Sequence, residues 1–252
     1  MKTQPLHIEQ GIKSNVLIIV PAYNEASGIR NTIASIKEHA PYADLVVVND
    51  GSMDNTGSIA EMQGVPVLNL SCNLGIGGAV QAGYRYAEEN DYTYAVQIDG
   101  DGQHNPADLS YLLQAMRENE VDMVVGSRFI EKRGFQSTFT RKLGIGLLAN
   151  LVSALTGQRI TDPTSGYRLC SRKAISLFSR EYPTDYPEVE ALVLLDNYRG
   201  KFMEVPVVMS ERDGGVSSIS AFKSCYYMIK VTLAVLITKS KKKREWSLGY
   251  GN

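Results

Sequence analysis

Short apolar runs alternate with helical patterns through the first half of the chain. The runs are rich in Val, Ile and Leu and lack in–out alternation, which is typical of strands buried on both faces. The predicted strands are Val16–Val20, Leu45–Val48, Val65–Leu70, Tyr94–Ile98 and Met123–Val125. The helices predicted between them are Ala26–His39, Asn55–Met62, Gly78–Glu89 and Pro106–Glu118. This order predicts an α/β fold with a mostly parallel central sheet and helices on both faces.

The second half is less regular and shows no linker. Its predicted elements are helices at Thr140–Leu155, Lys173–Phe178 and Val189–Tyr198, a strand at Phe202–Met209, and a turn over 162–168 that leads into a strand. We therefore expect one domain over 1–218, with 219–252 as an amphipathic helix and basic tail that belongs to that domain or extends to a membrane surface. The three cysteines lack metal-ligand spacing and the N-terminus lacks a signal peptide, so a cytoplasmic protein is expected.

Two acids follow the fourth predicted strand. Asp99 and Asp101 are two residues apart, so their carboxylates can point toward one place, and Gln103 adds a neutral oxygen. Hard oxygen ligands of this kind suit Mg²⁺ or Mn²⁺, which often complete their shell with water and substrate phosphates. His104 could also reach a metal, but a packing or capping role is favoured because the oxygen ligands already suffice.

Polar and glycine-rich segments follow the other strands as well. In open α/β sheets, ligands bind outside the carboxyl ends of the strands. The segments are Pro21-Ala22-Tyr23-Asn24-Glu25, Asn49-Asp50-Gly51-Ser52 and Asn73-Leu74-Gly75-Ile76-Gly77-Gly78. Acids and glycines gathered on one edge of a sheet predict a nucleotide site with a metal.

In this order, with Val125-Gly126-Ser127-Arg128 and Asp162-Pro163-Thr164-Ser165-Gly166-Tyr167-Arg168, the motifs resemble family 2 glycosyltransferases of the GT-A fold. The nearer resemblance is to the branch of dolichyl-phosphate-mannose and polyprenyl-phosphate-hexose synthases, and it covers residues 15–218. It implies a Rossmann-like sheet, a UDP- or GDP-sugar donor, a divalent metal on the diphosphate, and a lipid phosphate acceptor.

The resemblance also implies residue roles. Pro21, Tyr23, Glu25 and Asp50 would hold the base and ribose, and Asp99, Asp101 and Gln103 the metal. The full expected donor set is Pro21, Ala22, Tyr23, Glu25, Asp50, Gly51, Gly75, Gly77, Asp99, Gly100 and Arg212. Arg128 would face the acceptor phosphate or the donor sugar. Arg141 matches an acceptor-phosphate arginine, although Ile145 occupies the position of the serine that accompanies it in mannosyl members.

The expected catalytic residues depend on the acceptor. A phosphate monoester is mostly dianionic at neutral pH, so it needs cations and no base, and Arg128, Arg141 and Arg168 could supply them. A glycan hydroxyl needs a base to take its proton, and Glu188 or Glu190 could serve. Arg168 could instead form a structural ion pair with Asp162, and both glutamates could simply be acids at a helix N-terminus. A sugar nucleotidyltransferase, which also uses a metal on an α/β sheet, is a weaker alternative.

The C-terminal segment predicts contact with a membrane surface or with the core. Apolar residues recur at helical spacing at Phe222, Tyr226, Ile229, Leu233 and Leu236, and a basic cluster follows at 239–244. The longest uncharged run of this C-terminal segment, 231–238, is far shorter than the ~20 residues a spanning helix needs. The chain is expected to act peripherally at the inner face of the cell membrane, with a small membrane protein as one possible partner and with no nucleic acid.

Overall fold

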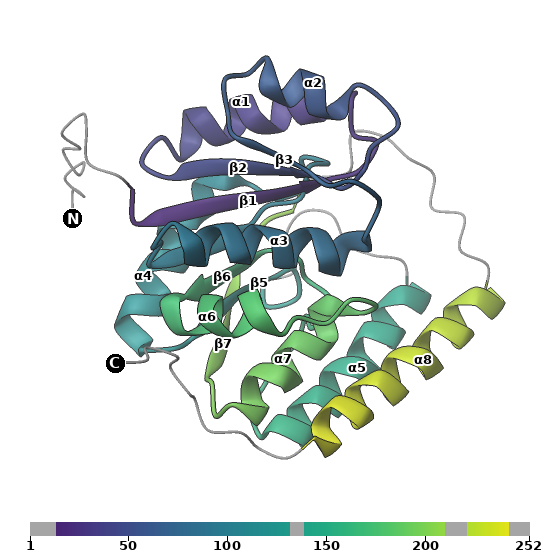
Figure 1. Ribbon diagram of the computed structural model, residues 1–252. Helices are drawn as coiled ribbons and strands as arrows, with labels where there is room; N and C mark the ends of the chain where they lie inside the picture. Colours follow the sequence, from purple (N-terminus) through teal and green to yellow (C-terminus); the bar gives the residue numbers. More distant parts are fainter. Residues whose placement is uncertain (1–13, 132–138, 210–220, 242–252) are drawn as a thin grey trace.

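The computed structural model describes residues 14–131, 139–209 and 221–241, including every side chain in these ranges except those of 139–141 and 221–225. A seven-stranded sheet in the order β3-β2-β1-β4-β6-β5-β7 runs through the centre of this part of the molecule (Figure 1). The strands are β1 Val16–Ala22, β2 Asp44–Asn49, β3 Val67–Asn69, β4 Tyr94–Gln97, β5 Met123–Ser127, β6 Arg168–Ser171 and β7 Phe202–Pro206. All run in one direction except β6, which is antiparallel to both of its neighbours. The predicted mostly parallel sheet is confirmed.

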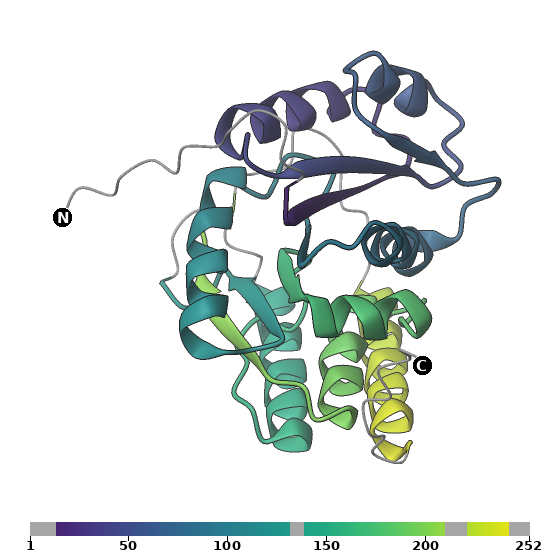
Figure 2. The ribbon, with the colours of Figure 1, turned by 60° about the vertical axis from the view of Figure 1, so that its left-hand side comes forward.

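Two layers of helices cover the sheet (Figures 1 and 2). One layer holds α1 Ile29–His39, α2 Thr56–Glu61 and α4 Leu109–Asn119, which follows a 3₁₀ turn at Pro106–Asp108. The other holds α3 Gly75–Glu89, α5 Phe139–Thr156, α6 Arg172–Arg180, α7 Pro187–Asn197 and α8 Ala221–Ser240. Along β1, Leu17 and Ile19 pack into the second layer, while Ile18 and Val20 pack into the first. This two-sided burial explains why β1 carries no polar residue on either face.

The predicted elements are present, and their ends differ for local reasons. Helix α1 begins three residues later than predicted, because the preceding backbone amides bond to side chains beyond β2: Glu25 N–H donates to Thr56 Oγ1 and Ala26 N–H to Asp54. Strand β3 is only three residues long because it pairs with the last residues of β2 alone. The turn over 162–168 does lead into a strand, β6, which inserts between β4 and β5.

Helix α8 packs on the core through a face other than the one identified from the sequence. Val231 and Val235 are buried against the layer that contains α5 and α7. The Asn197 side chain donates to the Thr238 carbonyl, and the Lys239 ammonium lies 2.5 Å from an Asp196 carboxylate oxygen. The sequence-identified residues Tyr226, Ile229, Leu233 and Leu236 are exposed on the opposite side. The side chain of Phe222 and the basic residues from 242 onward lie outside the described parts.

Candidate active site

A cavity of about 410 Å³ opens where β1, β2 and β4 end. Ten of the predicted site residues line it: Pro21, Ala22, Tyr23, Glu25, Asp50, Gly75, Asp99, Gly100, Asp101 and Glu188. Asn73, Ile76 and Ala79 complete the wall; the first two belong to the segment 73–78 that the sequence analysis placed at this edge, and Ala79 follows it. They belong to the start of α3 and the segment before it, so their presence follows from the position of that helix. The structure thus brings the four strand-end segments of the sequence together in one cavity.

The loops after β1 and β2 fix each other across the cavity wall. Asn24 adopts a left-handed backbone conformation with φ 55°, which Asn tolerates better than most residues. Its backbone N–H donates a 3.0 Å hydrogen bond to Ser52 Oγ, and its side-chain oxygen accepts from the Met53 N–H at 2.9 Å. The buried Asp50 carboxylate accepts a 2.7 Å hydrogen bond from the Leu74 N–H, which ties in the loop before α3. These hydrogen bonds between side chains and backbone hold this wall of the cavity in place.

Gly51 and Gly77 lie outside the cavity lining and permit close backbone packing instead. At Gly51, with φ +65°, a Cβ would lie 2.7 Å from the Asn73 nitrogen. At Gly77 a Cβ would lie 2.3 Å from the Pro183 carbonyl oxygen. Both approaches need glycine, so the structure gives these two predicted site residues a role in closing the wall.

His104 orients Asp99. The His104 ring is buried and stacks on Tyr167 with centroids 5.0 Å apart. Its Nδ1 accepts a 3.1 Å hydrogen bond from the Asp99 N–H, which assigns the ring proton to Nε2, and Nε2 lies 3.7 Å from Asp99 Oδ2. The other carboxylate oxygen of Asp99 accepts a 2.8 Å hydrogen bond from the Gln97 amide. The imidazole therefore holds the Asp99 backbone and packs on Tyr167, while its Nε2 lies beyond hydrogen-bond distance of the Asp99 carboxylate.

The carboxylates in the cavity suit a divalent metal that also binds a substrate phosphate. Asp99 and Asp101 both line the cavity, whereas Gln103 does not; its N–H donates to Asp101 Oδ1 at 3.1 Å. Within the described ranges, no group of three or more His, Cys, Asp or Glu side chains could hold a metal by itself. Two carboxylates are enough for Mg²⁺ or Mn²⁺ when water and phosphate oxygens supply the remaining ligands.

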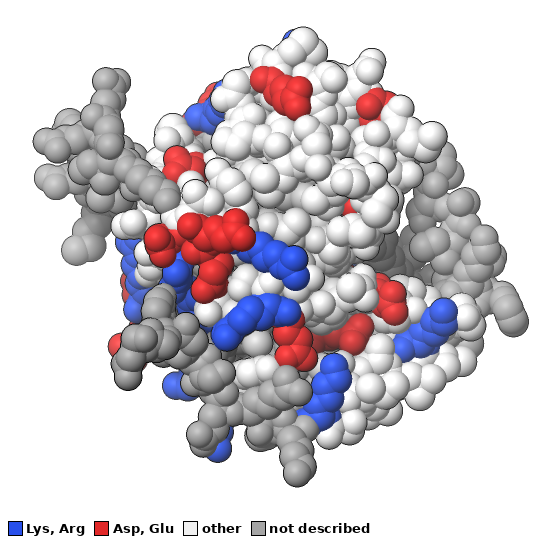
Figure 3. All heavy atoms as spheres, viewed as in Figure 1, with Lys and Arg blue, Asp and Glu red and all other residues white. Residues whose placement is uncertain are grey.

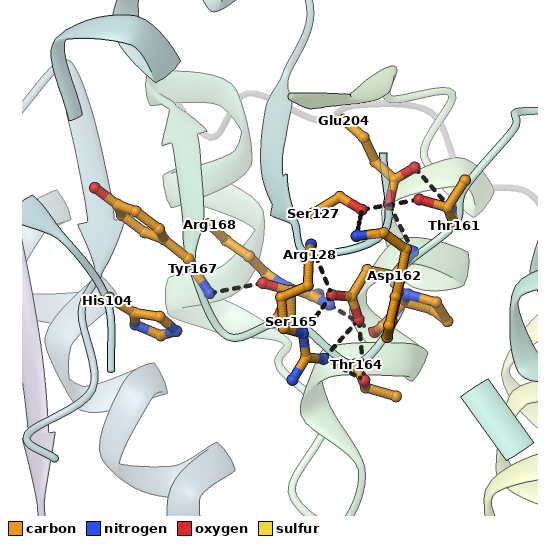
Figure 4. Close-up of polar contacts among 12 residues, drawn as sticks. His104, Ser127, Arg128, Thr161, Asp162, Thr164, Ser165, Tyr167, Arg168 and Glu204 are labelled. Atoms are coloured by element: carbon orange, nitrogen blue, oxygen red, sulfur yellow. Dashed lines mark hydrogen bonds and ion pairs between the residues drawn. The ribbon is translucent and has the colours of Figure 1, made fainter. Parts of the chain in front are cut away.

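Arg128 is bound to Asp162 (Figure 4). Its Nε and Nη2 each donate to one carboxylate oxygen at 2.7 Å, and Nη2 also reaches Thr164 Oγ1 at 3.0 Å. Asp162 is fully buried, and its own N–H and that of Thr161 donate to the Glu204 carboxylate at 2.6 Å. Burial raises the pKa of Glu204, which these hydrogen bonds partly offset. Arg128, predicted to face a phosphate or sugar, thus sits in a preformed ion pair and is not among the residues that line the cavity.

Arg168 is a buried cation, and among the described residues no carboxylate lies at ion-pair distance from it. The residue is 1% exposed; Nε donates to the Ser165 carbonyl at 2.7 Å and Nη2 to the Pro163 carbonyl at 2.9 Å, while Nη1 has no hydrogen-bond partner in the described parts of the chain. Asp162 is bound to Arg128, so the alternative of an Arg168–Asp162 ion pair, which the sequence analysis left open, is not the arrangement found. The Arg168 side chain instead folds back onto the backbone carbonyls of Pro163 and Ser165 in its own turn.

The two candidate bases, Glu188 and Glu190, lie in different surroundings. Glu188, in the first turn of α7, lines the cavity, and burial raises the pKa of its carboxyl while the nearby Arg168 charge lowers it. Glu190 turns to α8, where its carboxylate accepts a 3.0 Å hydrogen bond from the Thr238 hydroxyl. Burial raises the pKa of Glu190 also. Only Glu188 of this pair has access to a ligand in the cavity.

Two predicted arginines are not described at the side-chain level. Arg141 lies in the first turn of α5, and nothing is described of its side chain. Arg212 lies outside the described residues. Ile145, at the position where the resemblance implies a serine, is buried in the core.

Comparison with known sequences decides the family. Residues 17–178 match the family described as glycosyl transferase family 2. The chain belongs to glycosyltransferase family 2. This glycosyltransferase is 33% identical to the undecaprenyl-phosphate mannosyltransferase of Micrococcus luteus over 81% of the chain and 87% of that protein. It is 30% identical to the polyprenol monophosphomannose synthase of Mycolicibacterium smegmatis, over 85% of the chain and 84% of that protein. The resemblance drawn from the motifs is confirmed.

The solved structures give the fold of the glycosyltransferase. Glucosyl-3-phosphoglycerate synthase from Mycobacterium tuberculosis, in complex with Mn²⁺, UDP and glucosyl-3-phosphoglycerate, superposes with a TM-score of 0.67 at 20% identity. The match covers 92% of this chain and 81% of that chain. At this identity the likeness establishes the GT-A fold, which confirms the fold class.

Proposed function

We propose that this glycosyltransferase is metal-dependent and inverting, and that it transfers a hexose from a UDP- or GDP-sugar to a polyprenyl phosphate. The observation that carries the proposal is the shared cavity of Tyr23 and Asp50 with Asp99 and Asp101. Its first pair suits the base and ribose end of a nucleotide, and its second pair the diphosphate end with its metal. The relatives named for undecaprenyl-phosphate and polyprenol substrates support a lipid phosphate acceptor.

In the proposed reaction, a phosphate oxygen of the acceptor attacks C1 of the sugar on the side opposite the diphosphate. The new C1–O bond forms as the bond from C1 to the diphosphate oxygen breaks, and the electron pair leaves with the nucleoside diphosphate. The acceptor phosphate, with a second pKa of about 6, carries no proton that must be removed. A bound Mg²⁺ or Mn²⁺, held by Asp99 and Asp101, would stabilise the negative charge of the leaving group.

The residues of this chain then bind and orient the two substrates. For the acceptor phosphate we propose Arg128 and Arg141, with Arg168 as a buried positive charge close to Glu188. Because Asp162 and Thr164 already hold Arg128, an acceptor phosphate would compete with Asp162 for its guanidinium. For the donor we further propose Arg212 as a phosphate contact. The enzyme would act at the cytoplasmic face of the membrane, where it would meet both substrates.

A transfer assay tests the proposal. Purified protein with Mg²⁺ or Mn²⁺ is given radiolabelled UDP-glucose, UDP-N-acetylglucosamine or GDP-mannose together with undecaprenyl phosphate. We expect one donor to label an organic-extractable product that mild acid releases, and we expect chelation of the metal to stop the labelling. If no donor labels the lipid while glycan acceptors stimulate release of nucleoside diphosphate, the lipid-phosphate acceptor is wrong.

One observation favours a second candidate, the same fold transferring to a glycan hydroxyl. Glu188 places a carboxyl in the cavity, where it could take the proton of a hydroxyl acceptor, and burial raises its pKa. Glu188→Gln would then lower turnover by about 10²-fold or more, whereas a phosphate acceptor predicts a change of only a few-fold. Glu190→Gln is the matched control, because Glu190 bonds to Thr238 and does not line the cavity.

A further inference from the structure

A buried arginine holds the turn over 162–168 together. Of the Lys and Arg residues whose side chains the structure describes, only Arg168 is buried. The others are half-buried or exposed, and several lie beside Asp or Glu on the face drawn in Figure 3. The Arg168 guanidinium donates to the carbonyls of Pro163 and Ser165, inside the turn. Burying a charge costs free energy, so a group that is buried only to bond to its own turn indicates that the shape of this turn is important.

The 162–168 turn lies against the segment that follows β4. Tyr167 stacks on His104 (Figure 4), and its hydroxyl donates to the Asn105 carbonyl at 2.9 Å. His104 Nδ1 in turn accepts from the Asp99 N–H. The turn is therefore fixed to the same loop that carries the two carboxylates proposed to hold the metal.

Gly166 is the point at which the turn meets the Asp99 carboxylate. Gly166 is buried, and a Cβ at this position would lie 3.0 Å from Asp99 Oδ2 and 3.3 Å from Asp99 Oδ1. It would also lie 3.0 Å from Gln97 Nε2, the atom that donates to Asp99 Oδ1 at 2.8 Å. These distances are shorter than ordinary van der Waals contact. The carboxylate and the Gln97 amide therefore keep their positions only because residue 166 has no side chain.

We propose that the 162–168 turn positions the Asp99 carboxylate for the metal. Gly166 provides the surface against which the carboxylate lies, and Arg168 holds that part of the turn in place through the carbonyls on its inner side. Neither residue lines the cavity, so both are positioning residues that act through Asp99. Metal–ligand distances vary by only about 0.2 Å, so a displaced carboxylate would bind Mn²⁺ less well. The inference rests on the proposed function, in which Asp99 holds the metal.

Calorimetric titration of the full chain with Mn²⁺ tests the role of Gly166. The variant Gly166→Ala adds one methyl group at a residue whose φ is not positive, so the backbone itself accepts alanine. We expect Mn²⁺ affinity to fall by about tenfold or more, as is typical when a group that orients a metal ligand is changed. Binding of UDP in the presence of a chelator should stay unchanged, and transfer at saturating Mn²⁺ should approach that of the unchanged protein. The control is Gly146→Ala in α5, where a Cβ would meet nothing within 4 Å.

Two further variants separate the hydrogen bonds of Arg168 from its charge. Arg168→Lys keeps the positive charge but replaces the planar guanidinium by a compact ammonium, which cannot reproduce the two fixed N–H groups. Arg168→Met removes both the charge and the donors. If Arg168 positions the turn, both variants should lose Mn²⁺ affinity by a similar factor, about tenfold. Circular dichroism and urea unfolding report the folding of each variant, and Gly166→Ala decides alone if an Arg168 variant does not fold.

Two results overturn the inference by itself. If Gly166→Ala binds Mn²⁺ as tightly as Gly146→Ala, the turn does not position Asp99. If Arg168→Lys keeps full Mn²⁺ affinity while Arg168→Met loses it, the charge of Arg168 supports the site and its hydrogen bonds do not. If the unchanged protein binds no Mn²⁺, the proposed metal site is wrong and the inference fails with it. A failed transfer assay with the expected Mn²⁺ affinities would refute the proposed acceptor and leave the positioning role supported.

Discussion

The sheet has two halves, one with β1, β2 and β4 and the other with β5, β6 and β7, and these halves hold their polar side chains in different ways. Around β1, β2 and β4, side chains bond mainly to backbone amides, as Asp50 does to Leu74 and Asn24 to Met53. Around β5, β6 and β7, a buried ion pair joins Arg128 to Asp162, and the backbone N–H of Asp162 in turn donates to the Glu204 carboxylate. The first side presents a preformed cavity, whereas the second is closed on itself. A nucleotide could enter the first side without rearrangement, but an anion that binds Arg128 must displace or share Asp162.

The strongest test of the cavity side is Asp101→Ala. Removing one of the two carboxylates should lower transfer on the order of 10³-fold, because the metal's charge is then poorly held at the leaving group. Initial rates at saturating Mn²⁺ measure the loss, and Mn²⁺ titration should show weakened binding. Glu38→Ala, which removes an exposed acid from α1, is the control. Full activity of Asp101→Ala would exclude a role of this carboxylate in catalysis.

The corresponding test of the other side is a measurement of stability. Asp162→Ala removes the carboxylate that forms the ion pair with the Arg128 guanidinium, which is only 11% exposed. Breaking a buried pair in this way should lower the free energy of unfolding by about 3 kcal/mol, as measured by urea denaturation. Arg128→Met with Asp162→Ala should recover part of the loss, because no uncompensated charge remains. An unchanged unfolding midpoint for Asp162→Ala would mean that the second side is not held by this ion pair.

His104→Phe separates orientation from packing on the cavity side. The phenyl ring can still stack on Tyr167, but it cannot accept from the Asp99 N–H. We expect activity to fall by about 10-fold, with weaker Mn²⁺ binding, since groups that orient a metal ligand typically contribute 10- to 100-fold. His39→Phe, in the last turn of α1, is the matched control. A loss of stability with unchanged metal affinity would assign His104 a structural role only.

The smallest expected effect concerns pH. Burial raises the pKa of Glu188 in the folded protein, so the folded state holds this proton more tightly than the unfolded chain does. Its contribution to stability is therefore present below the ordinary carboxyl pKa of about 4.3 and is lost as the pH rises through the folded value. Glu188→Gln should be slightly more stable than the unchanged protein at pH 8, with the difference shrinking toward pH 4. Urea unfolding at both pH values checks the sign; a destabilised Glu188→Gln at pH 8 would contradict it.

The cavity side could be largely predicted from the sequence because its information is local. Each strand ends within a few residues of the polar group that it delivers, and a parallel sheet brings those ends to one edge. The partner of Arg128 could not be predicted, because Asp162 is 34 residues away and reaches it only through the turn before β6. The antiparallel direction of β6 is likewise set by pairing with β4 and β5. The side of α8 that faces the core was missed because apolar residues occur on both sides.

Strand β6 also affects how the chain can fold while it is being synthesised. It occupies the edge of β4 that β1 leaves open, and it does so with residues 168–171. A nascent chain that ends before these residues can form β3, β2, β1 and β4 but exposes the backbone of β4 along one edge. Unpaired edges of this kind recruit other strands. Fragments truncated between β5 and β6 should therefore aggregate during translation, even though they contain nearly the whole wall of the cavity.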